Sequence, residues 1–104
     1  MAFNGTEGKA IDLGKAADWA SNYREAHNDE VQSRFFGRDI LLTLLKQPGC
    51  EGIRIYYGLD GSVPQMMAVG VDSNENDQLG DNFIIADDTM CGPPRTGKNN
   101  ALNS

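Results

Sequence analysis

The spacing of the apolar residues changes at Gly52, and this change limits the folds that the chain can adopt. Before Gly52, apolar residues recur at helical spacing in segments 12–27 and 30–46, whereas after it they alternate as in a strand, first in 53–58. Helical segments followed by strands are typical of α+β domains. Because 104 residues suffice for one hydrophobic core, we predict a single domain over residues 11–91.

The second helical segment, 30–46, does not keep one apolar face. Its apolar residues lie on two opposite sides: Phe36, Ile40 and Leu44 on one, and Val31, Phe35 and Leu42 on the other. We therefore expect a break at Gly37, which lies between the two phases. The run Ile40–Leu45 is the expected centre of the core, and the helix is expected to end at the Pro48-Gly49 pair.

Three strands are expected after Gly52. They cover residues 53–58, 65–72 and 82–86, and turn-forming residues separate the first from the second. Short connections between successive strands favour an antiparallel meander, with the helices packed on one face. The polar ends of the chain, residues 1–10 and 92–104, carry Gly or Pro and are expected to be flexible.

With the helices on one face, nothing obvious covers the other face of this sheet. Its expected residues are Arg54, Tyr56, Met66, Ala68 and Ile84. Arg, Tyr and Met are enriched at protein interfaces, and a three-stranded sheet also has open edges. An N-terminal segment or the tail shields this face, or Tyr56 and the stem of the Arg54 side chain cover it, or another protein does. We favour the last alternative, a non-enzymatic interaction or accessory module that self-associates, for example as a homodimer, or binds a partner protein.

An acidic loop supports an alternative function. Oxygen-bearing side chains occur at close spacing in Asp72, Asn74, Asn76 and Asp77, as in loops that bind calcium. The pattern then departs from an EF-hand, because Asp77 stands where Gly is required. Asn and Asp are also common in ordinary turns. The alternatives are therefore a plain turn and a small cation- or ligand-binding module, with calcium as the cation.

Charge and cysteine content exclude further classes. A net charge of -6 argues against nucleic acid and anionic membranes as partners, because both are bound through clustered Lys and Arg. Cys50, Cys91 and the single His27 are too few for a structural zinc site, and no catalytic set can be singled out. No secretory or membrane-spanning segment is recognisable, so a cytoplasmic location is expected.

Four short segments of the chain are distinctive: Phe36-Gly37-Arg38-Asp39-Ile40, Gln47-Pro48-Gly49-Cys50, 52–58 (GIRIYYG) and Val69-Gly70-Val71-Asp72. Together they resemble a group of small uncharacterised bacterial proteins. The resemblance covers roughly residues 11–94. It implies a bacterial cytoplasmic protein and implies no activity.

Overall fold

The structure is a computed structural model that describes residues 2–88, 90–93 and 96–103. Contacts between residues group the chain into two compact units. The first, which we call the sheet unit, comprises Met1–Glu7 and Phe36–Thr89, and the second, the helix unit, comprises Gly8–Phe35 and Met90–Ser104. The single domain expected over residues 11–91 stays a prediction.

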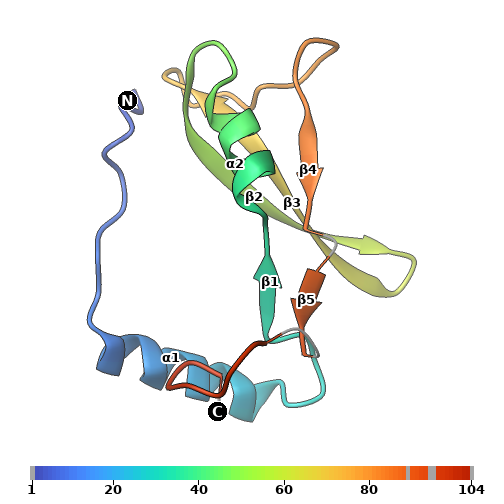
Figure 1. The fold of residues 1–104 in the computed structure, drawn as a ribbon. Coiled ribbons are helices and arrows are strands. Elements are labelled where there is room, and N and C mark those ends of the chain that lie inside the picture. Colours follow the sequence, from blue (N-terminus) through green and yellow to red (C-terminus); the bar gives the residue numbers. More distant parts are fainter. Residues whose placement is uncertain (1, 89, 94–95, 104) are drawn as a thin grey trace. The chain divides into compact units, whose positions relative to one another are not determined.

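The sheet unit is built on a long hairpin (Figure 1). Strands β2 (Cys50–Asp60) and β3 (Val63–Asp72) pair antiparallel, and β4 (Ile85–Asp87) adds to the other side of β3. Gly61 begins the two-residue turn with a φ of 63°, the left-handed conformation that tight hairpin turns require. The order β2-β3-β4 confirms the predicted antiparallel meander and the α+β class.

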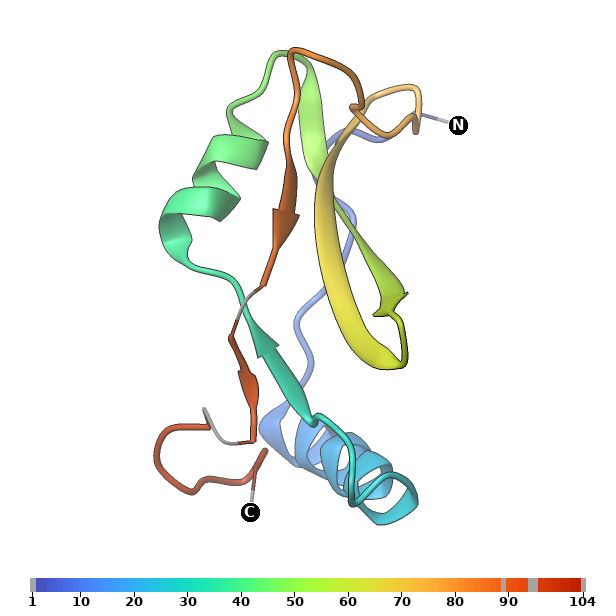
Figure 2. The same cartoon turned by 90° about the vertical axis from the view of Figure 1, so that its right-hand side faces the viewer.

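Helix α2 (Arg38–Leu45) covers one face of this sheet (Figure 2). It begins directly after Gly37, which confirms the expected break, and Asp39 lies in its first turn, where a carboxylate is favoured. The core consists of Leu44, Ala68 and Ala86, with Phe36, Ile40 and Ile53 packed against it. Leu44 is the only buried residue of α2, so the helix is held to the sheet chiefly through this side chain.

The pairing register corrects the predicted composition of the two faces. Ile55 pairs with Ala68, whereas Arg54 pairs with Val69 and Tyr56 with Met67. Residues directly opposite in a ladder share a face, so Ala68 lies on the helix side and not beside Arg54. The expectation that all five interface candidates share one uncovered face is therefore wrong. Alternation fixes the faces within each strand, but the phase between two strands depends on where the turn begins.

The helix unit contains α1 (Leu13–Ala26) and a short antiparallel pair, β1 (Ser33–Phe35) with β5 (Met90–Gly92). The Asp12 carboxylate caps α1 by accepting the Lys15 N–H at 2.7 Å. The prediction of a helix from residue 30 is wrong, because residues 33–35 form a strand. Their partner lies more than 50 positions along the chain, where a helical period gives no signal.

The last strand of the sheet unit also differs from its predicted range of 82–86. Residues 82–84 remain outside the ladder, and the N–H of Phe83 donates to the Gly80 carbonyl in a turn. Only Ile85–Asp87 pairs with β3. In the described parts of the chain, no helix is long and apolar enough to cross a membrane.

Candidate functional site

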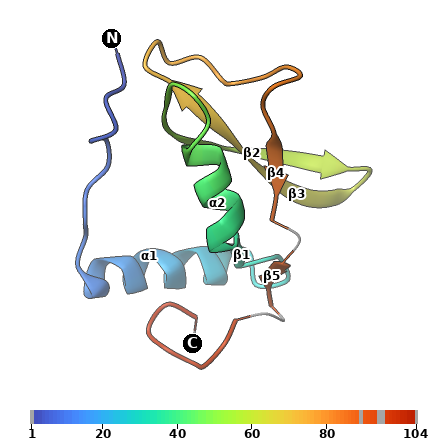
Figure 3. The same cartoon turned by 45° about the horizontal axis from the view of Figure 1, so that its top comes forward.

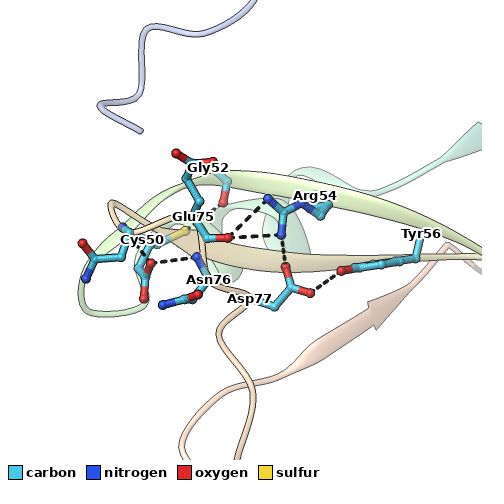
Figure 4. A network of polar contacts seen from close by, with 9 residues as sticks. Cys50, Gly52, Arg54, Tyr56, Glu75, Asn76 and Asp77 are labelled. Atoms are coloured by element: carbon cyan, nitrogen blue, oxygen red, sulfur yellow. Dashed lines mark hydrogen bonds and ion pairs between the residues drawn. The ribbon is translucent and has the colours of Figure 1, made fainter. Parts of the chain in front are cut away.

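A polar network joins strand β2 to the acidic loop, and Asp77 is its centre (Figure 4). One carboxylate oxygen of Asp77 accepts from Nη1 of Arg54 at 2.5 Å, and the other accepts from the hydroxyl of Tyr56. The Arg54 guanidinium also donates to the Glu75 carbonyl at 3.4 to 3.5 Å. The strand residues Arg54 and Tyr56 lie two positions apart and so project from the same face of β2.

The acidic loop is closed by its own side chains. Oδ1 of Asp72 accepts the N–H groups of Asn74 and Asn76 at 2.9 and 3.0 Å, and the Asp72 N–H donates to the Asn76 carbonyl at 3.0 Å. Glu75, between them, has a φ of 70°. This is the local bonding by which Asp and Asn favour turns.

Two of the four predicted calcium ligands, Asp72 and Asp77, are therefore already engaged within the chain through their side chains. Asp77 accepts from Arg54 and Tyr56, and Asp72 accepts two backbone N–H groups. Among the residues that the structure describes, no three or more His, Cys, Asp or Glu side chains are grouped to hold a metal ion. Calcium binding by this loop stays a prediction, and a cation there would compete with the Arg54 guanidinium for the Asp77 carboxylate.

The charged form of the Arg54 guanidinium is stabilised by its partners. The hydrogen bond that Arg54 donates to Asp77 raises the pKa of Arg54 above its usual value, with a smaller contribution in the same direction from Tyr56. Its side chain is 35% exposed and that of Asp77 17%, so solvent partly screens the pair. The guanidinium lies 5.9 Å from the centre of the Phe3 ring, a cation–π distance.

The N-terminal segment borders an open groove beside this network. The Phe3 N–H donates to the Ser73 carbonyl at 2.9 Å, so residues expected to be flexible contact the acidic loop. The groove has a volume of about 530 Å³, and Phe3, Glu7 and Arg54 are among the residues that line it. Backbone N–H groups, that of Asn4 first, donate to the Glu7 carboxylate and lower its pKa.

The five predicted interface residues occupy different environments. Arg54 and Tyr56 are brought together by Asp77, but Ala68 is wholly buried in the core and Met66 is half-buried on the same side of the sheet. Ile84 precedes β4 and donates its N–H to the Gln47 side chain. Ala68 therefore cannot contact a partner while the sheet unit is folded, because α2 covers it.

Sequence reasoning missed the two large apolar residues that are most exposed in the described part of the chain. Tyr57 is 83% exposed and Leu59 72% exposed, both on β2 near the hairpin turn. The alternation of Tyr57 with Ile53 predicted a core position for Tyr57, and Leu59 was expected in the turn, whereas both lie on β2 on the face that α2 covers. However, α2 spans only eight residues, whereas β2 spans eleven and continues past its cover. The length difference between the helix and the hairpin is the signal that could have identified them.

Replacing Asp77 with Ala is expected to release the acidic loop from β2. The substitution removes the acceptor of both Arg54 and Tyr56, so we expect the thermal midpoint to fall by several degrees and the N–H groups of residues 72–77 to exchange faster with solvent. Asp81→Ala, which removes the same charge from an exposed position, is the matched control. Equal hydrogen-exchange rates in the two variants would show that Asp77 does not anchor the loop.

The cysteines take no part in a covalent link in the structure. Cys50 and Cys91 are both free thiols, and Sγ of Cys50 donates to the Gly52 carbonyl at 3.1 Å.

Comparison of the chain with protein-family models, with curated proteins and with solved structures gives no match.

Proposed function

We propose that this protein is a protein-binding module, without catalysis of its own, that binds its partner along the open edge of strand β2. The observation that carries the proposal is the combination, on one strand, of a free backbone edge and exposed apolar side chains. Arg54 and Tyr56 remain part of the contact surface, and Tyr57 and Leu59 join them.

The unpaired edge of β2 supports this proposal because it is long enough to accept a further strand. In the described part of the chain, β3 is the only strand that pairs with β2, whose other edge has no strand beside it. An edge strand exposes unpaired N–H and C=O groups that can accept a further strand, and proteins usually keep such edges short or protected. β2 has eleven residues, whereas β4, at the opposite edge of the sheet, has three.

The exposed side chains of β2 have the composition of an interface. Ile55, Tyr57 and Leu59 lie on one face of the strand and are all exposed, while Tyr56 is exposed on the other. The end of the β2–β3 hairpin projects away from α2 (Figure 3), so the helix does not cover it. Contiguous exposed apolar side chains mark sites of protein association, and Tyr is among the residues enriched there.

A photo-crosslinking experiment tests the proposed function. A photoreactive phenylalanine analogue replaces Tyr57 in the full chain inside cells, and the adducts are identified by mass spectrometry. We expect covalent adducts with a protein. The matched control carries the same analogue at Ile85, which is 60% exposed on the opposite edge strand, and is expected to give few adducts. The absence of any protein adduct from position 57 would contradict the proposed function.

A further inference from the structure

We infer that the partner is a second copy of this chain, and that the two β2 strands pair antiparallel about a two-fold axis at Tyr57. This inference rests on the proposed function and specifies its partner. Two sheets of three strands would then join into one continuous sheet of six, in an isologous contact where each copy uses the same residues.

Charge complementarity along β2 selects this register. In an antiparallel self-pairing centred on Tyr57, each residue lies opposite the one equally distant on the other side of residue 57. Arg54, three positions before, therefore lies opposite Asp60 of the second copy, and the axis repeats this pair at the other end of the contact. Opposite charges directly across a ladder stabilise the pairing, and like charges destabilise it.

The same register matches the apolar side chains. Tyr57 lies opposite Tyr57 of the second copy. Ile55 of each copy lies opposite Leu59 of the other, so this pair occurs once on each side of the axis. Residues opposite each other share a face, so these apolar side chains form one continuous stripe, while Arg54 and Asp60 pair on the other face. The side chains that are exposed in the single chain are thus the ones that the second copy covers.

Other parts of the sheet offer a poorer fit to a second copy. An alternative register would place Glu51 of one copy opposite Arg54 of the other. It would use the start of β2, where the pairing of β2 with β3 is irregular between Cys50 and Gly52. Gly5 of the N-terminal segment also lies at Glu51, which restricts access to that end. The β4 edge offers only three residues, which is too short for a matched set of charges and apolar pairs.

The polar network around Arg54 is compatible with an additional ion pair between Arg54 and Asp60 of the second copy. A guanidinium has five N–H donors in a planar arrangement, and among the described residues Asp77 and the Glu75 carbonyl accept from Nη1 and Nη2. The hydrogen bond that the guanidinium donates to Asp77 orients it. Asp60 is exposed at the end of β2, where a second copy can reach it.

Complementary substitutions at the two-fold position test the inference. In the register centred on residue 57, Tyr57→Lys places two ammonium groups opposite each other, and Tyr57→Glu places two carboxylates. We expect each variant to weaken the dimer by about tenfold or more. An equimolar mixture of the two variants is expected to restore association as a heterodimer, because an ammonium group then faces a carboxylate at the axis. Sedimentation velocity from micromolar to millimolar concentration measures all three samples and the unchanged protein.

The matched control variants are Ile85→Lys and Ile85→Glu on the opposite edge strand, which are expected to leave association unchanged. Because Tyr57 is 83% exposed, its variants should fold, and circular dichroism verifies this independently. A monomeric unchanged protein, or a mixture that fails to associate when the unchanged protein does, would overturn the inference. If the protein is monomeric but position 57 crosslinks to a different protein in cells, the self-pairing is wrong and the proposed function stands. If neither occurs, both are wrong.

Discussion

Leu44→Ala is expected to lower the free energy of unfolding by about 2–5 kcal/mol, because it removes the largest fully buried side chain and leaves a cavity. Leu44 has no exposed surface and belongs to the same core cluster as Ala68 of β3 and Ala86 of β4. The two alanines are small and cannot fill the space that the leucine leaves. Urea unfolding followed by far-ultraviolet circular dichroism measures the loss, and one-dimensional NMR shows whether the variant keeps a packed core.

The matched control is Leu42→Ala in the same helix, at a position that is 40% exposed. The substitution changes the same atoms and has nearly the same effect on helix propensity, so the difference between the two variants isolates burial. We expect the control to lose much less than Leu44→Ala. Equal losses would mean that α2 does not pack on the sheet through Leu44.

Gly70→Ala is expected to lower the free energy of unfolding by about 1–3 kcal/mol, because a methyl group at this position meets a packed amide cluster. An added Cβ would lie 2.5 Å from Oε1 of Gln78, 2.8 Å from Nε2 of Gln47 and 3.1 Å from Sγ of Cys50. These side chains cannot move freely. Gln78 is buried and donates to the Pro48 carbonyl at 2.8 Å, and Gln47 accepts the Ile84 N–H at 2.9 Å.

Two comparisons separate this steric effect from the general effect of Ala on a strand. Gly52→Ala on β2 adds a methyl group that meets nothing within 4 Å, so it is expected to change stability little. In a Gln78→Ala background, where one clashing side chain is absent, Gly70→Ala should cost less than in the unchanged protein. The same cost in both backgrounds would assign the loss to the backbone and not to the amide cluster.

The amide cluster also connects the core to the candidate site. Gln78 follows Asp77 directly, and its backbone N–H donates to the Gly70 carbonyl at 2.8 Å. Fixing Gln78 therefore fixes the end of the acidic loop, from which Asp77 reaches Arg54 and Tyr56. We expect Gly70→Ala to loosen this loop as well, which faster hydrogen exchange at residues 72–77 would report.

Features that depend on neighbouring residues could be predicted from the sequence. The hairpin was predicted because its alternating apolar residues flank a turn that contains Gly61, and both signals act within a few positions. The break at Gly37 was predicted because two apolar phases cannot share one straight helix. The turn-like character of the acidic loop was recognised for the same reason, since Asp72 bonds to groups only two and four residues away.

The contact of Asp77 with Arg54 and Tyr56 was not predicted, because these residues are far apart in the chain and meet only in the folded structure. Asp77 was assigned to a cation site, and Arg54 and Tyr56 to a separate surface. The sequence gives no measure of the distance between position 77 and β2, whereas the folded hairpin places the loop over that strand. The helix expected at residues 30–36 does not form for the same reason. Residues 33–35 form strand β1 by pairing with β5, which is distant in the sequence.

The sequence by itself determined the α+β class, the position of α2 and the antiparallel meander, because short-range periodicity and turn chemistry specify them. Only the tertiary structure decided which side chains share a face and which remain exposed. The register pairs Ile55 with Ala68 and so buries Ala68 under α2, and the shorter helix leaves Tyr57 and Leu59 uncovered. Register and relative length are properties of paired elements, and a single strand's pattern contains neither.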